Sequence, residues 1–514
     1  MISSPVITNR SAGVLLHPTS LPNQFGIGDL GPEAYFWVDA LAGAHQSWWQ
    51  VLPLHPTGYA DSPYQALSAF AGNPNLISPQ KLFEDGLLNH SDLEVPNFPV
   101  DAVDFASGKV IGYKNRLLEK AWMNYQKGNA PFLKSSFQSF CIEEQTWLDD
   151  FALYMTIKDA YHGISWIRWE DDLLTRRSDA LERAAIQFKD QVEQHKFRQF
   201  LFERQWQQLR TYANARGVRL IGDLPIFVSL DSSDVWSHPE FFQLNEYRMP
   251  KVIAGVPPDY FSSTGQLWGN PLYNWEFMRQ ENYDWWIERI RRALHLVNVI
   301  RVDHFRGFQA YWEVPGESLT AETGRWVQGP GVELFDVLTA RLGSLPIIAE
   351  DLGIITPDVD ALRTRYGFPG MRILQFAFAG AVEERFLPYN YEQNTVVYTG
   401  THDNDTIRGW YDSATKAEQA FLHKYLGRDN SDISWDLIRL AWSSVAVLAV
   451  TPLQDILSLG TEARMNLPGC PSGYWRWRFR KEMLSNEVLN RLGELTEVYG
   501  RAVLPSPGMV KAPG

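Results

Sequence analysis

Eight short apolar segments recur along the chain, each about the length of a β-strand and several of them ending in polar residues. Between them, apolar residues repeat at helical spacing. Near-continuous apolar strands that alternate with helices are typical of a parallel sheet buried on both faces. Eight such strands predict a closed (β/α)8 TIM barrel, and they cover residues 13–21, 47–54, 218–228, 297–305, 346–353, 370–378, 395–404 and 446–457.

The segments before several of these strands have the pattern of amphipathic helices. Apolar residues from Phe202 to Ala213 lie on one helix face, and Gly217 can end that helix just before the third strand. A second helix is predicted over about 282–297, before the fourth strand. Thr356 followed by Pro357 is a typical helix start. The alternation of helix and strand therefore holds on both sides of the middle of the chain.

Two stretches are too long for simple barrel connections. They are residues 55–200, after the second strand, and residues 229–280, after the third. Loops of that length usually carry function or form subdomains, and the loops that follow the strands of a TIM barrel build its active site. We expect one catalytic barrel over residues 1–514, with these two insertions on its C-terminal face. Too little chain follows the eighth strand for an added C-terminal β-sandwich.

Composition narrows the class of partner. The chain has 47 basic and 60 acidic residues, a formal charge of −13, so neither nucleic acid nor an anionic membrane surface is an expected partner. Two cysteines, Cys141 and Cys470, and an N-terminus without a signal-peptide pattern predict a cytoplasmic protein. Its 20 tryptophans suit the flat faces of sugar rings, although most of them are expected to pack in the core.

Three predicted strands end in or beside an acid, and these acids are the candidate chemistry. They are Asp303, Glu350 and Asp403. A single acid at a strand end usually caps a helix or forms an ion pair, whereas burying an acid without a partner is costly. Three acids that converge on one barrel mouth therefore favour a catalytic site.

Cleavage of a glycosidic bond requires a carboxylate and a carboxylic acid on either side of the anomeric carbon. Arg301, two residues before Asp303, lies on the same side of the strand and is expected to keep Asp303 ionised, as a nucleophile requires. Glu350 follows an apolar run and is expected to hold its proton longer, as an acid does.

Longer segments carry a resemblance to known enzymes. IRVDHFRGF (300–308), IIAEDLG (347–353) and THDND (401–405) resemble the catalytic strand ends of the α-amylase clan. The segments 61–78 and 255–275, with GDLPIFVSLDSSDVW at 222–236, resemble glycoside hydrolase family 77, the amylomaltases. The resemblance extends over nearly the whole chain.

This resemblance implies a retaining 4-α-glucanotransferase that moves part of an α-1,4-glucan or maltooligosaccharide onto another glucan or glucose, without cofactor or metal. Asp303 would be the nucleophile, Glu350 the general acid and base, and Asp403 a third carboxylate that holds sugar hydroxyls. The loop 257–273 would be a lid over the acceptor. The other residues that it implies contact glucan are Tyr64, Asp223, Arg301 and His402 at the reacting sugar, Tyr59 at a secondary region, Tyr260, Gln266, Trp268 and Asn270 on the lid, and Asn466.

Two other functions remain open at this point, an α-glucan hydrolase with the same three acids and a glucan-binding protein without activity. Other chemistries are disfavoured. The GIGDLG segment at 26–31 matches a dinucleotide fingerprint, but no acid follows at the required distance of about 20 residues. His304 and His402 lack compact metal-ligand spacing, and the serines lack a nucleophile-elbow context.

Overall fold

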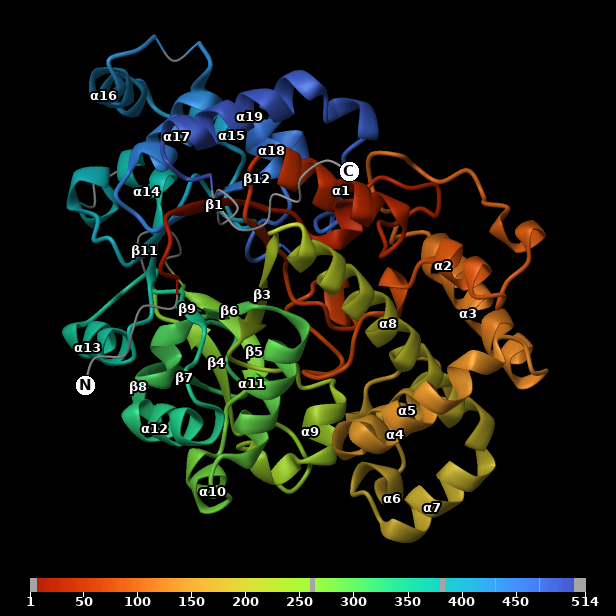
Figure 1. The fold of residues 1–514 in the computed structure, drawn as a ribbon. Coiled ribbons are helices and arrows are strands. Elements are labelled where there is room, and N and C mark those ends of the chain that lie inside the picture. The colour runs from red at the N-terminus through yellow and green to blue at the C-terminus, as the bar shows by residue number, and fades with distance from the viewer. Residues whose placement is uncertain (1–6, 259–263, 380–383, 430, 471, 503–514) are drawn as a thin grey trace.

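The computed structural model describes residues 7–258, 264–379, 384–429, 431–470 and 472–502 (Figure 1). Within them, eight parallel strands form one sheet in the order β10-β11-β12-β1-β2-β3-β6-β9. The Ala349 amide donates to the Pro369 carbonyl at 2.9 Å, which joins the two outer strands. The barrel prediction is confirmed, and each predicted strand overlaps one strand of the sheet. These strands are β1 (Ser11–Leu15), β2 (Trp48–Gln50), β3 (Arg219–Pro225), β6 (Val299–Asp303), β9 (Ile347–Ala349), β10 (Gly370–Ile373), β11 (Thr395–Tyr398) and β12 (Leu448–Pro452).

Helices surround this sheet and fill its connections. Gly217, with φ +77°, follows the end of α8 as predicted, and α13 begins after Thr356. The α-helices are α1 (Pro32–Gly43), α2 (Pro79–Glu84), α3 (Lys109–Gln126), α4 (Lys134–Glu143), α5 (Gln145–Ala160), α6 (Asp171–Leu174), α7 (Ser178–Gln187), α8 (Lys189–Ala215), α9 (Ser233–Ser237), α10 (Trp275–Gln280), α11 (Asp284–Leu296), α12 (Gly331–Leu342), α13 (Pro357–Arg365), α14 (Leu374–Phe378), α15 (Ile407–Ser413), α16 (Lys416–Leu426), α17 (Ile433–Ser443), α18 (Leu453–Ile456) and α19 (Asn486–Val498).

The helices between β2 and β3 form a lobe at the side of the barrel, and α8 runs from this lobe back to β3 (Figure 1). A buried ion pair fastens the lobe to the GIGDLG segment, because Lys114 of α3 donates to Asp29 at 3.1 Å. That segment is thus a packed loop that opens α1. The boundaries 55–200 and 229–280 of the two insertions stay predictions.

A second, antiparallel sheet was not predicted. Its order is β5-β4-β7-β8, with β4 (Val252–Val256) and β5 (Gln266–Pro271) inside the second insertion and β7 (Ala310–Pro315) and β8 (Arg325–Gln328) after β6. The β7–β8 hairpin is therefore a third addition to the barrel. Because β8 has only four residues, most of them exposed, it carries too short a pattern to be recognised without its partner.

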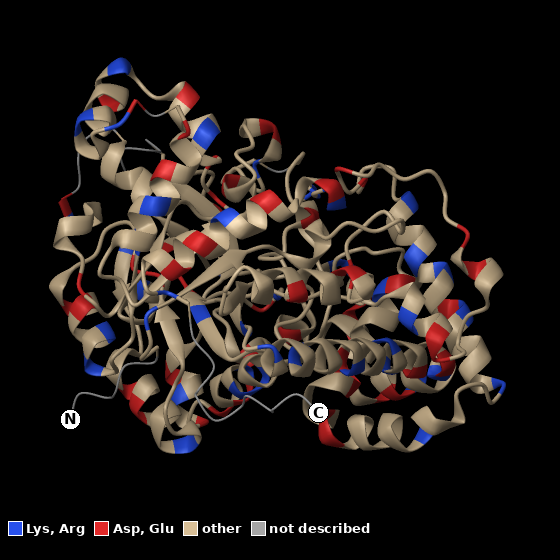
Figure 2. Ribbon diagram, turned by 45° about the horizontal axis from the view of Figure 1, so that its top comes forward, with Lys and Arg blue, Asp and Glu red and all other residues tan. Residues whose placement is uncertain are grey.

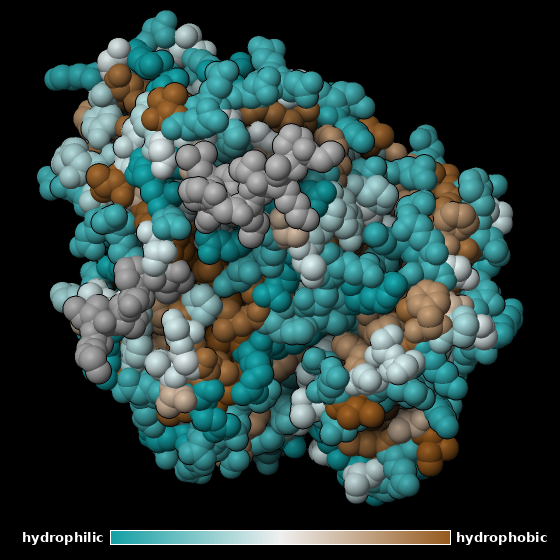
Figure 3. All heavy atoms as spheres, viewed as in Figure 1, coloured by the Kyte–Doolittle hydropathy of each residue, from teal (hydrophilic) through white to brown (hydrophobic). Residues whose placement is uncertain are grey.

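Most of the aromatic content belongs to the core, as expected. Of the 20 tryptophans, 15 are buried, which leaves Trp147, Trp268, Trp312, Trp326 and Trp410 with more accessible rings. Basic and acidic residues intermingle along the helices (Figure 2), and one face is mostly hydrophilic with separate hydrophobic patches, including one over α4–α7 (Figure 3). Among the described residues, no helix is both long enough and apolar enough to span a membrane.

Candidate active site

Arg301 lies at the centre of a buried charge cluster at the carboxyl ends of β3 and β6. Its Nη1 donates to both oxygens of Asp223, at 2.8 and 2.7 Å, and lies 3.0 Å from Oδ1 of Asp303. Asp223 reaches Arg301 because the two are register partners on paired strands. Arg301 and Asp303 share a side of β6 because side chains alternate along a strand. The structure therefore brings together these three predicted site residues.

Glu350 follows β9 directly and lies beside Asp303. Val302 is the register partner of Ala349, and Asp303 and Glu350 are the residues that follow them. The two acids therefore lie opposite each other on neighbouring strands, which are about 4.8 Å apart. The carboxylate of Glu350 accepts hydrogen bonds from the backbone amides of His304, at 2.8 Å, and Leu352, at 2.7 Å. These two bonds fix the direction in which the Glu350 carboxylate points.

Burial raises the pKa of both carboxyl groups, and Arg301 opposes that rise in each. The predicted direction is correct for Glu350 but wrong for Asp303, whose pKa was expected to be kept low by Arg301. Burial is the larger cause, and Arg301 does not offset it because its one positive charge also faces Asp223. The Asp303 side chain is 29% exposed, and water offsets part of the burial effect there. Such neighbours titrate as a pair, and repulsion favours the state with one proton between them.

Asp403 and His402 follow β11 and face a residue of the first insertion. The His402 ring stacks on Tyr64, with centroids 5.2 Å apart and an angle of 12°, and the Tyr64 hydroxyl donates to Asp223 at 2.9 Å. Nε2 of His402 lies 3.3 Å from Oδ1 of Asp403. Burial lowers the pKa of His402, so it contacts Asp403 as a neutral imidazole. Tyr64 thus connects the charge cluster to His402.

Three of the predicted lid residues, Gln266, Trp268 and Asn270, lie on β5, whose register with β4 shifts between Leu267 and Pro271. Trp268 packs the edge of its ring against His304, with centroids 4.8 Å apart, and its indole donates to Gln266 at 3.2 Å. Asn270 is buried, and its amide donates to the Val228 carbonyl at 2.9 Å. Trp268 therefore lies beside the residue that follows Asp303, whereas Asn270 fastens β5 to the segment after β3.

The remaining predicted residues lie in different surroundings. Asn466 donates through Nδ2 to Oδ1 of Asp403 at 2.6 Å, so it lies beside the third predicted acid. Tyr59 is 72% exposed in a short 3-10 helix, Tyr59–Asp61. Tyr260 lies outside the described residues.

The sequence did not predict the contacts that two residues near the acids, His304 and Trp475, make. His304, considered only as a metal ligand, has a left-handed backbone with φ +52°, and its amide donates to Glu350. Trp475 packs against Tyr64 and His402, with both centroid distances 5.8 Å. No periodic pattern surrounds Trp475 that would have indicated a role. In the described part of the chain, no group of three or more His, Cys, Asp or Glu side chains is arranged to hold a metal ion.

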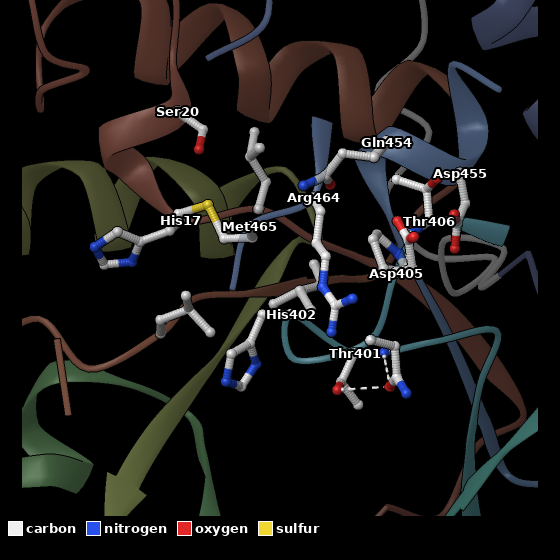
Figure 4. A pocket seen from close by; sticks show the side chains of 15 residues that line it. His17, Ser20, Thr401, His402, Asp405, Thr406, Gln454, Asp455, Arg464 and Met465 are labelled. Carbon is white, nitrogen blue, oxygen red and sulfur yellow. Dashed lines mark hydrogen bonds between the residues drawn. The ribbon is translucent and has the colours of Figure 1, made fainter. Parts of the chain in front are cut away.

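A small cavity lined in part by His402 lies among the segments that follow β1, β11 and β12 (Figure 4). Its volume of about 20 Å³ suits one water molecule and is far too small for a sugar.

Comparisons with known proteins agree over nearly the whole chain. The glycoside hydrolase family 77 profile, described as 4-alpha-glucanotransferase, matches residues 16–484. A 4-alpha-glucanotransferase of Thermus thermophilus is 49% identical over 96% of this chain and 99% of its own, and one of Synechocystis is 48% identical over 97% and 99%. The structure of amylomaltase from Streptococcus agalactiae in complex with acarbose covers 96% of this chain and 100% of its own, with 40% identity and a TM-score of 0.92. This chain belongs to the 4-α-glucanotransferase family, glycoside hydrolase family 77.

Proposed function

We propose that this enzyme transfers a segment of an α-1,4-glucan to a new position on an acceptor, which is glucose, a maltooligosaccharide or another α-1,4-glucan, with retention of configuration. The main support is the register of β6 and β9, which sets Asp303 and Glu350 side by side next to Arg301. Carboxyl groups about 5 Å apart suit a covalent glycosyl intermediate. A retaining cycle begins with one ionised and one protonated carboxyl group, which is the state of a pair that shares one proton.

The first step forms a bond between Asp303 and the anomeric carbon of the donor. The bond to the leaving glucan breaks, and its oxygen takes the proton of Glu350. In the second step the ionised Glu350 removes the proton of an acceptor hydroxyl, whose oxygen attacks the anomeric carbon and releases Asp303. The proton returns to Glu350, so the enzyme ends the cycle unchanged.

The surrounding residues bind and orient the sugar in this proposal. Asp403, held by Asn466, would accept hydrogen bonds from hydroxyls of the distorted ring, with Asp223, His402 and Tyr64 beside it. Acceptor contacts would come from Gln266, Trp268, Asn270 and Tyr260, and contacts to a more distant part of the glucan from Tyr59.

Transfer requires an acceptor sugar to compete with water at about 55 M for the intermediate, by binding and by exclusion of water. Incubation with pure maltotriose tests this. Transfer yields glucose and a ladder of longer oligomers with a constant number of reducing ends, because each cleaved bond is replaced by a new one. A steady rise in reducing ends would identify a hydrolase. If the wild-type protein and Asp303→Asn bound maltotriose alike and neither formed any product, the chain would be a binding protein without this chemistry.

We also propose that the enzyme acts in the cytoplasm, in maltooligosaccharide, starch or glycogen metabolism. Transferase activity and accumulated maltooligosaccharides, measured in fractions of cells with and without the enzyme, test this. Activity confined to the medium or membrane fraction would refute it.

A further inference from the structure

The loop that carries Asp403 is fastened to a loop about 60 residues later in the chain. The Thr461 hydroxyl donates to Asp405 at 2.9 Å, and the Asn466 backbone amide donates to the His402 carbonyl at 3.0 Å. Together with the Asn466 side chain, these bonds hold both ends of the segment 402–405. The two loops follow β11 and β12, which are neighbours in the barrel.

Arg464 lies in the middle of this junction. Its guanidinium donates through Nη2 to the Asp403 carbonyl at 2.6 Å and through Nε to the Asn466 carbonyl at 2.7 Å. One planar group therefore fixes the backbone of Asp403 and the backbone of the residue that holds the Asp403 carboxylate. Figure 4 shows Arg464 extending between His402 and Thr401. Both bonds go to backbone carbonyls, so within the described residues Arg464 holds the backbone of this junction and not a side-chain acid.

We propose that Arg464 is a positioning residue for Asp403, and this inference rests on the proposed function. Arg464 does not touch the reacting atoms in the proposal. It acts by setting where the Asp403 carboxylate stands relative to the sugar. The fork of the guanidinium suits two carbonyls at once, which a lysine ammonium cannot reproduce with the same geometry.

The test compares three variants on maltotriose. In Arg464→Ala we expect kcat to fall by about 100-fold, since a displacement of about 1 Å can have that effect. KM should change far less, because Asp403 acts mainly on the distorted ring of the transition state. Arg464→Lys should recover only part of kcat. Arg408→Ala is the matched control, since Arg408 is an exposed arginine on α15, 4.0 Å from Asp412, and it should keep wild-type kinetics.

Chemical rescue separates positioning from a loss of folding. Arg464 is only half-buried, so guanidinium ion added to Arg464→Ala can reach the vacated place and should restore part of kcat, with no such effect on Asp403→Asn. The inference is overturned if Arg464→Ala keeps kcat within a factor of two of Arg408→Ala. It is also overturned if neither guanidinium nor lysine restores any activity. A wild-type protein without transfer activity would instead refute the proposed function.

Discussion

Replacing Asp223 by asparagine would remove one negative charge beside Asp303 at almost constant side-chain size. Both carboxylates contact the same Nη1 of Arg301, at 2.7 and 3.0 Å. Their nearest oxygens are thus within about 6 Å, where two unit charges repel by about 3 kcal/mol at an effective dielectric constant of about 20. That energy corresponds to a pKa difference of about two. Because water reaches part of Asp303, we expect its pKa to fall by roughly one to two.

The sign of the effect follows from the role of Asp303. It must be ionised to attack, and a lower pKa leaves it ionised at lower pH. The acid limb of kcat/KM for maltotriose should therefore move to lower pH by roughly one to two units when measured between about pH 4 and pH 9. The maximum rate should also fall, because Asp223 holds Arg301 and the Tyr64 hydroxyl. The position of the limb, and not its height, is the quantity that tests the reasoning.

Asp412→Asn is the matched control for the loss of one carboxylate. Asp412 lies on α15 with 68% of its side chain exposed, so its replacement should leave the acid limb where it is. An acid limb of Asp223→Asn that stays in place, or that moves to higher pH, would refute the idea that Asp223 and Asp303 compete for Arg301.

Three further predictions concern stability and water exclusion. Burial raises the pKa of Asp455 to about 7, above its value in the unfolded chain, so the stability that this group contributes is lost as pH rises from about 4 towards 7. Urea unfolding at several pH values should show this loss. In Asp455→Asn this pH dependence should disappear. Trp206 is fully buried and donates to the Leu296 carbonyl at 2.8 Å, so Trp206→Ala should lower the free energy of unfolding by about 3–5 kcal/mol. Trp326 is 39% exposed, so Trp326→Ala should lower the free energy of unfolding by only about 1 kcal/mol. Equal losses of unfolding free energy in the two variants would contradict the assignment of Trp206 to the core. Trp268→Ala removes a ring beside His304 that we expect to keep water from the intermediate, so it should raise the ratio of hydrolysis to transfer. This ratio is measured as new reducing ends per glucose released. An unchanged ratio with unchanged stability would show that Trp268 does not shield the intermediate.

The barrel strands could be predicted because each is buried on both faces. Every residue of β11 and β12 is buried, so the apolar run itself marks the strand. The second sheet could not be predicted in this way. Its strand β8 is largely exposed, and its existence depends on pairing with β7, whose Trp312 is the register partner of Trp326.

The acids of the site were also accessible from sequence, since they stand where apolar strands end. The raised pKa of Glu350 could be predicted as well, but that of Asp303 could not, because it depends on contacts between distant segments. The pKa of Asp303 is raised by its burial, and Arg301 does not cancel that rise because it also binds Asp223, a contact across 78 residues. The role of Arg464 follows from a bond to the Asp403 carbonyl across 61 residues, in a segment without periodic pattern.

The charge of this cluster also explains how one arginine can serve both halves of the proposed cycle. Before the first step, the Asp303–Glu350 pair holds one proton and one negative charge, next to the permanent charge of Arg301. After it, Asp303 is neutral as a glycosyl ester and Glu350 carries the negative charge. The pair therefore keeps the same net charge while the charge moves between two adjacent strands. Arg301 acts electrostatically on both acids, so its position needs no change between the two steps.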